Sequence, residues 1–286
     1  MLILVLILSN VLLAVFFRLL PKYGISNLKA IIINYFTCFC LGSLMIGEWP
    51  LKQEHVDSEW FIYALFLSIC FIIFFNINAL TIQRVGMIIT SIFQKLSLVF
   101  PVLMGVLLFH ESLNTANKMA LPITFAAIVL SNLPNRKYQE TVDAMKKYWY
   151  LPVLVFAGSG LIEVSLFYAQ ETGKIGDHGM QFTSCLFGFA GLWGLTFLAA
   201  IKKLKFSPRE VLAGIMIGIP NFFSIYLLIK GLELGWKGAI LFPVNNVGVI
   251  FFTAVVAILF FHEKLSKANY LGLLLALTAV VLFAIE

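Results

Sequence analysis

Charged residues are scarce in this chain of 286 residues, because Asp, Glu, Lys and Arg make up only 12% of it. A soluble domain has about 25% of these residues. Hydrophobic residues make up 61% and run in blocks of about 20, the length that crosses a hydrocarbon layer of about 30 Å as a helix. A soluble core is excluded, and we expect an all-α polytopic membrane protein. The net charge of +6 comes from Lys and Arg between the apolar blocks, so we expect no nucleic-acid partner.

Several motifs of enzymes and secreted proteins are also missing. The first apolar block is too long for a cleaved signal and lacks a small-residue cleavage site, so we interpret it as a span. There is no Walker, Rossmann or nucleophile-elbow pattern, and neither His110-Glu111 nor His262-Glu263 has the second histidine of a zinc protease. We expect no enzymatic activity, cofactor or bound metal. The cysteines are few, lie in apolar blocks and form no disulfide or zinc pattern: Cys38, Cys40, Cys70 and Cys185.

Ten apolar segments are expected to cross the bilayer, five on each side of a polar connection. We predict a first repeat at 1–133, a linker at 134–148 and a second repeat at 149–286. Because five is odd, the second repeat enters from the opposite side, and the two are inverted about an axis in the membrane plane. The expected spans are 2–20, 28–47, 60–80, 86–109, 118–133, 149–170, 178–201, 209–230, 237–261 and 268–285.

The chain repeats part of its own sequence. LLFHESLNTANK at 107–118 is echoed by LFFHEKLSKANY at 259–270, and the same offset of 152 residues pairs Gly86 with Gly238. Each repeated His-Glu pair ends a span. We expect its glutamate to cap the following helix or to anchor the turn.

Two charges fall inside expected spans, where each costs about 2.5–3.5 kcal/mol unless it is paired or hydrated. Glu163 lies near the middle of the sixth span, and we interpret it as a proton or cation site; the alternative is a structural hydrogen bond between helices. Lys95 lies in the fourth span. It either extends to the membrane surface or faces a cavity, as an anion site or as a partner for Glu163.

Polar side chains fall at matching depths of the fourth and ninth spans. The offset pairs Gln94 with Asn246, and Asn245 is adjacent. We predict that these three line a pseudo-symmetric substrate site, although amides also hydrogen-bond between helices without a ligand. Gly214 and Gly218 form a small-xxx-small pair, which predicts close helix packing.

The combination resembles the drug/metabolite transporter superfamily, in particular its EamA-type members with ten helices. In both halves a helix opens with a glycine, passes polar and Pro positions, and ends in a Glu-x-Leu turn, at Glu111-Ser112-Leu113 and Glu263-Lys264-Leu265. The resemblance implies a carrier with a central cavity that works without ATP. In four-helix relatives a Glu of the first helix binds protons and cationic drugs. Glu163 is the counterpart in the second half, whereas Val11 occupies the matching place in the first.

We therefore expect a secondary active transporter, with export as the favoured direction, for small metabolites such as amino acids. We expect transport to proceed by alternating access and to be coupled to protons. A non-transporting scaffold or sensor is the first alternative, and a membrane-embedded lipid-modifying enzyme is the second. We expect the chain in a bacterial inner membrane. Lys and Arg concentrate in the odd-numbered connections, which places both termini outside.

Overall fold

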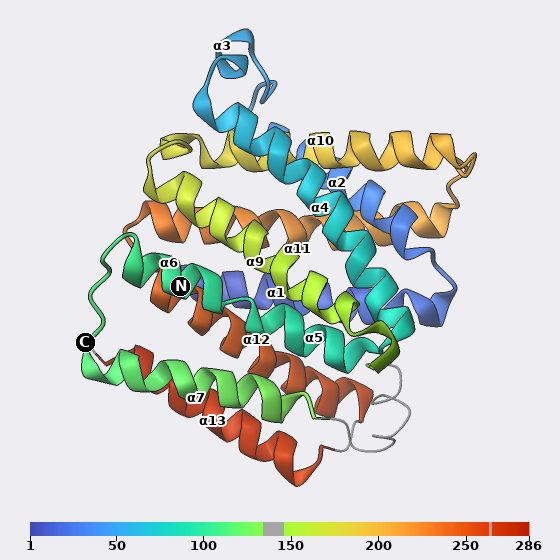
Figure 1. Ribbon diagram of the computed structural model, residues 1–286. Coiled ribbons are helices and arrows are strands. Elements are labelled where there is room, and N and C mark those ends of the chain that lie inside the picture. Colours follow the sequence, from blue (N-terminus) through green and yellow to red (C-terminus); the bar gives the residue numbers. More distant parts are fainter. Residues whose placement is uncertain (134–145, 263–264, 286) are drawn as a thin grey trace. The chain divides into compact units, whose positions relative to one another are not determined.

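The computed structural model describes residues 1–133, 146–262 and 265–285, and most of them lie in helices (Figure 1). No strand occurs within these ranges. Short elements lie between the long helices: η1 (Pro21–Tyr23), α3 (Gln53–Val56) and η2 (Gly176–His178). The long elements are α1 (Leu2–Leu19), α2 (Asn27–Ile46), α4 (Glu59–Arg84), α5 (Met87–Leu96), α6 (Val99–Leu107), α7 (Thr115–Ser131), α9 (Tyr150–Glu171), α10 (Gly179–Ala200), α11 (Pro208–Glu233), α12 (Gly238–Phe261) and α13 (Lys267–Phe283).

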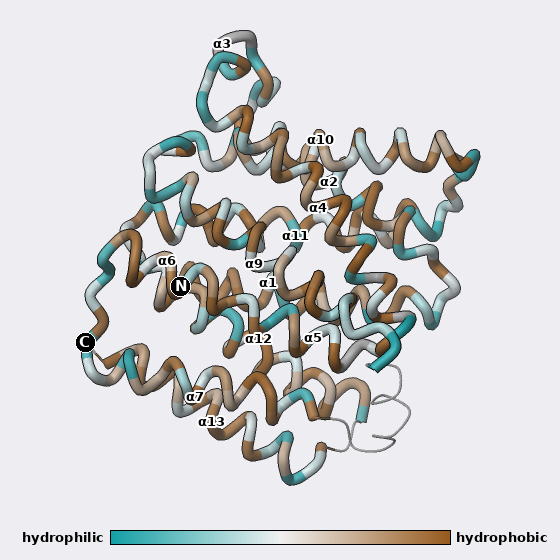
Figure 2. The backbone as a smooth tube through the Cα atoms, viewed as in Figure 1, coloured by the Kyte–Doolittle hydropathy of each residue, from teal (hydrophilic) through white to brown (hydrophobic). Residues whose placement is uncertain are grey.

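Eight segments within the described residues are helical, long and apolar enough to cross a bilayer. Figure 2 shows the apolar character of these helices and the polar residues that gather at helix ends and turns. α7 and α13 are also apolar but have 17 residues each, the lower end of the range of about 17–25 for a transmembrane helix. The chain is thus an integral, multi-pass membrane protein in contact with lipid.

The expected fourth span, 86–109, is two helices instead of one. α5 ends at Leu96, and α6 begins at Val99. Pro101 has no N–H for the carbonyl of Ser97, four residues earlier, and its ring would clash with that carbonyl in a continuous helix. The Ser97 carbonyl instead accepts from the amide of Phe100 at 2.9 Å, which tightens the chain into a turn. The helix is therefore interrupted in the turn that precedes the proline, between Leu96 and Val99.

The helices form two compact units, and each unit combines segments from both halves of the sequence. Unit 1 consists of Met1–Ile73 and Ser165–Gly235. Unit 2 consists of Phe74–Val164 and Trp236–Glu286. The compact units therefore differ in their residues from the predicted repeats, 1–133 and 149–286. Most of the predicted linker lies outside the described residues.

Within unit 1, α2 packs against both α10 and α11, and α1 packs against α11. The contact of α2 with α11 depends on the predicted pair of glycines. A Cβ on Gly214 would lie 2.4 Å from the Cβ of Ile33, and one on Gly218 would lie 2.5 Å from the Cβ of Thr37. The prediction that Gly214 and Gly218 allow close packing is confirmed.

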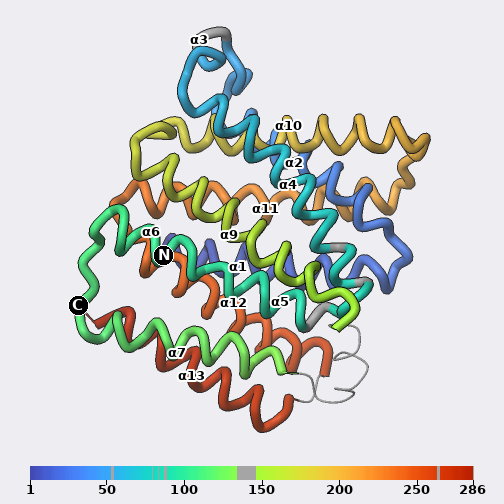
Figure 3. Tube along the Cα trace, viewed as in Figure 1, coloured from blue at the N-terminus to red at the C-terminus, as the bar shows by residue number. Residues whose placement is uncertain are grey.

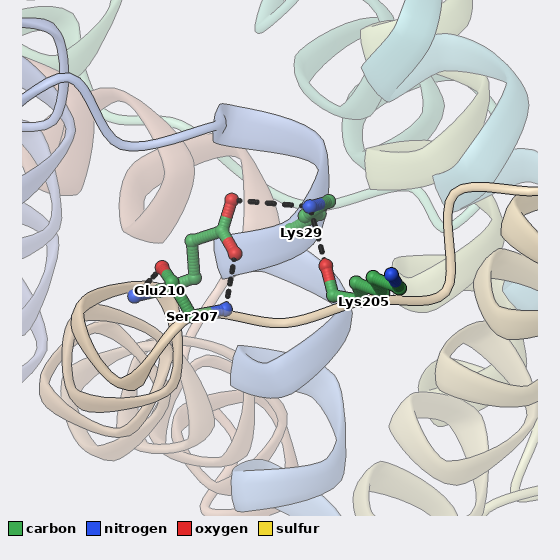
Figure 4. A network of polar contacts seen from close by, with 4 residues as sticks. All are labelled: Lys29, Lys205, Ser207 and Glu210. Atoms are coloured by element: carbon green, nitrogen blue, oxygen red, sulfur yellow. Dashed lines mark hydrogen bonds and ion pairs between the residues drawn. The ribbon is translucent and has the colours of Figure 1, made fainter.

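In unit 1, a network of polar contacts links the start of α11 to the start of α2 (Figure 4). Ser207 Oγ accepts from the amide of Glu210 at 3.3 Å, and Glu210 Oε2 accepts from the amide of Ser207 at 2.7 Å. Glu210 Oε1 pairs with Lys29 Nζ at 3.5 Å, and this nitrogen donates to the carbonyl of Lys205 at 2.5 Å. A lysine in the first turn of a helix opposes the helix dipole, and Glu210 offsets that charge.

Within unit 2, α7 and α13 lie side by side (Figure 3), and α6 packs against α12. Gly272 of α13 allows the first contact, because an added Cβ would lie 2.3 Å from the amide nitrogen of Ser131. Asn269 Nδ2 also lies 2.9–3.1 Å from the carbonyl oxygens of Leu130, Ser131 and Leu133, and its two hydrogens are shared among these acceptors at the end of α7.

The prediction that Glu111 caps the helix that follows it is wrong, because its carboxylate caps α12 instead. Its two carboxylate oxygens accept from the amides of Gly238 and Ala239 at 2.7 and 2.8 Å, at the first turn of α12. The following helix, α7, is capped by Asn114, whose Oδ1 accepts from the amide of Asn117 at 2.8 Å. The repeated Glu263 lies outside the described residues.

The local geometry of the two echoed segments is also alike. His110 and His262 both have a left-handed backbone, with φ of 52° and 51°. Ser266 caps α13 as Asn114 caps α7, and the bounds of α7 and α13 differ by the same 152 residues that relate the two sequences.

Candidate functional site

Glu163 lies in the interior of α9, partly buried, and its carboxylate reaches the break between α5 and α6. Ser97 Oγ lies 3.0 Å from Glu163 Oε2. The approach is possible because Gly160, one turn earlier, has no side chain: a Cβ there would lie 2.0 Å from the ring of Phe100. Phe100 in turn packs on Phe156, with ring centroids 4.8 Å apart. Aromatic packing against a glycine thus sets the position of the carboxylate.

Lys95 lies in the last turn of α5, where a cation is favoured by the negative end of the helix dipole. Its Nζ donates to Asn246 Oδ1 of α12 at 3.0 Å. Asn246 is buried, and its Nδ2 donates to the carbonyl of Phe242 at 3.1 Å, which fixes the orientation of the amide. The lysine therefore contacts a preoriented acceptor on α12.

Lys95 and Glu163 interact electrostatically but contact different partners. In the part of the chain that the structure describes, the hydrogen bond of Lys95 goes to Asn246 and that of Glu163 goes to Ser97. Each charge is thus held by a neutral side chain rather than by the opposite charge. This arrangement leaves both charges with capacity for a further ligand.

Ser97 is the site residue that sequence reasoning missed. Its side chain is fully buried, and Oγ also lies 2.6 Å from the carbonyl oxygen of Gln94. The available signal was its spacing from Pro101, because the residue four positions before a proline loses a helical hydrogen bond.

The five predicted site residues lie in unit 2, and two of them, Lys95 and Asn246, are hydrogen-bonded to each other. Glu163 contacts Ser97 at the break and interacts electrostatically with Lys95. Gln94 takes part through its backbone carbonyl, while its side chain is exposed. Asn245 is partly buried beside Asn246.

A hollow of about 500 Å³ lies elsewhere in unit 2. It is lined by α6, α7 and the turn between them, including Val102, Glu111 and Leu121. None of the five predicted site residues lines it. Among the described residues, no three His, Cys, Asp or Glu side chains are grouped closely enough to hold a metal ion.

Comparison with known proteins supports the fold without indicating an activity. No family model matches the chain. A relative from Haemophilus influenzae, described as an uncharacterized protein, is 25% identical over 284 residues, which cover 96% of this chain and 94% of the relative. A solved structure described as "Crystal structure of protein" has a TM-score of 0.71 at 14% identity and covers 98% of this chain and 94% of its own. The chain thus shares its fold with a protein of known structure.

Proposed function

We propose that the protein is a secondary active transporter of small metabolites, such as amino acids, and that Glu163 carries the coupling proton. The observation that carries this proposal is the pair of opposite charges at a helix break in unit 2. Each charge is costly in the membrane interior, and ionisable groups there mark proton or substrate pathways by default. Interrupted helices serve the same purpose in transporters, because their free ends bind ions and charged groups.

The proposed roles follow from the contacts. Glu163 exchanges a proton, and Lys95 with Asn246 binds an anionic or polar group of the substrate. Neutral partners compete more weakly for a charge than an ion pair would, so a substrate or a proton can replace them. Gln94 and Asn245 are proposed as further polar contacts of the substrate.

The proposed architecture has ten spans in two inverted five-helix repeats, with α7 and α13 crossing the membrane as well. The equal offset of these two helices and the matching left-handed His110 and His262 support a duplicated ancestor. Inverted repeats are the usual basis of alternating access. We further propose an EamA-type carrier in a bacterial inner membrane with both termini outside.

The test is transport by the purified full chain in proteoliposomes. A panel of radiolabelled amino acids and related metabolites is offered with and without an imposed pH gradient. Glu163→Gln is expected to abolish gradient-driven transport, whereas Glu171→Gln at the exposed end of the same helix is expected to leave it intact. Gradient-driven transport of equal rate in Glu163→Gln contradicts the role of Glu163, and a panel without any transported compound counts against the carrier.

A further inference from the structure

Ser97 has a single hydroxyl hydrogen but two acceptors within hydrogen-bond distance. The carbonyl oxygen of Gln94 lies at 2.6 Å, and Glu163 Oε2 lies at 3.0 Å. One hydroxyl hydrogen serves one of these acceptors at a time. Both contacts are hydrogen bonds together only when Glu163 is protonated, because its own O–H then donates to Ser97 Oγ while Ser97 donates to Gln94.

The Gln94 carbonyl is one of the last in α5 and has lost its helical partner. In a continuous helix it would accept from the amide of Leu98, but this amide donates to the carbonyl of Lys95 at 3.4 Å. The Ser97 hydroxyl replaces the missing backbone donor. A carbonyl without a donor is destabilising inside a membrane-spanning segment, so this hydroxyl stabilises the break.

We propose that Ser97 is a positioning residue that transmits the protonation state of Glu163 to the break between α5 and α6. This inference rests on the proposed function, because it takes Glu163 as the proton site. When Glu163 releases its proton to water, the carboxylate becomes the stronger acceptor, and the Ser97 hydroxyl turns to it from the Gln94 carbonyl. The end of α5 then lacks a donor and loosens. Uptake of a proton from water reverses the change.

The surroundings of Glu163 limit what else can drive this exchange. α5 contributes Lys95, the charged side chain that interacts with Glu163. α4 and α6 contribute uncharged rings to the same stretch of α9, through Phe74 on Gly158 and Phe100 on Gly160. In the part of the chain that the structure describes, the exchange therefore involves Glu163, its interaction with Lys95, and the Ser97 hydroxyl that lies between Glu163 and the Gln94 carbonyl.

The experiment uses the full chain in liposomes as wild type, Ser97→Ala and Ser97→Thr. Infrared difference spectroscopy follows the protonated carboxyl of Glu163 over pH, and Glu163→Gln identifies its band. Amide hydrogen exchange of peptides that cover the break is measured over the same pH range. Glu163→Gln at each pH corrects for the intrinsic pH dependence of exchange.

Wild-type amides at the break are expected to exchange about fivefold faster when Glu163 is ionised, the factor that corresponds to about 1 kcal/mol for one hydrogen bond. Ser97→Ala is expected to lose this dependence, and Ser97→Thr, which keeps the hydroxyl, to retain it. If exchange follows the Glu163 titration equally in Ser97→Ala, the role of Ser97 is overturned while Glu163 stands as the proton site. If no carboxyl band titrates in the wild type, the proposed function fails as well. If Ser97→Ala does not fold, the wild type still provides a test. Amide exchange at the break that does not change as Glu163 titrates overturns the role of Ser97 but leaves Glu163 as the proton site.

Discussion

Replacing Gly160 with alanine tests the close approach that places Glu163 beside Ser97. The new Cβ would lie 2.0 Å from the Phe100 ring, whereas ordinary contact begins at 3.4 Å, so the ring or the helix must move by about 1.4 Å. Phe100 cannot turn freely because it packs on Phe156. A movement of this size would stretch the 3.0 Å contact of Ser97 with Glu163 beyond hydrogen-bond distance.

Two opposing effects decide the size of the change. Overpacking costs about 1–3 kcal/mol, and the better helix propensity of alanine returns up to about 1 kcal/mol. We expect a net loss of about 1–2 kcal/mol in the free energy of unfolding. The melting temperature of the purified protein should fall by several degrees, at about 2–4 °C per kcal/mol.

The control for Gly160→Ala is Gly191→Ala on α10, where the new Cβ would lie 3.2 Å from the Phe36 ring and needs a displacement of only a few tenths of an ångström. The double variant Gly160→Ala with Phe100→Leu is expected to regain part of the stability, because the smaller side chain frees the space. If Gly160→Ala has the same melting temperature as the control variant and the same transport activity as the wild type, α9 does not pack on α6 as closely as described.

Further predictions concern the other polar contacts. Glu111→Ala removes both acceptors from the first turn of α12 and should cost about 1–2 kcal/mol in thermal unfolding, with a smaller loss in Glu111→Asp; equal stability of Glu111→Ala and the wild type would exclude the cap. Lys29 and Glu210 should show a coupling energy of about 1 kcal/mol in a double-mutant cycle, reduced by salt, and a coupling of zero would make their contact irrelevant to stability. The hydrogen bond with Glu59 raises the pKa of Lys174. The contribution of this hydrogen bond to the stability of the folded protein is therefore complete at neutral pH, and it is lost as the pH rises from about 10.5 through the raised pKa. Melting curves of Lys174→Met should therefore show a weaker alkaline loss than the wild type, and identical alkaline slopes would contradict this.

Local sequence patterns were sufficient to predict the helices. Apolar blocks marked nearly every helix boundary, and the spacing of Gly214 and Gly218 predicted their packing role, because both signals lie within one helix. The break at Ser97 was harder to predict. Pro122, Pro220 and Pro243 lie inside continuous helices, so a proline alone does not decide whether a helix ends.

The contacts of the site depend on how helices rotate against one another, which one sequence does not reveal. The offset paired Gln94 with Asn246, yet the side chain that reaches Asn246 is the neighbouring Lys95. A difference of one position turns a side chain by about 100° around a helix. Glu111 illustrates the same limit, since its partner, the start of α12, is distant in sequence.

The interleaving of the two units has a consequence for biosynthesis. α2 packs against α10 and α11, so it can form these contacts only after both helices have been synthesised. α2 ends at Ile46 and α11 ends at Glu233, which is 187 residues later. At about 5–20 residues per second, the ribosome needs roughly 10–40 s to supply them. During that interval Asn34, which later accepts a hydrogen bond from Asn221 of α11, sits in the nascent membrane protein without this partner. The early helices must therefore be sheltered by lipid or by the insertion machinery until translation is almost complete.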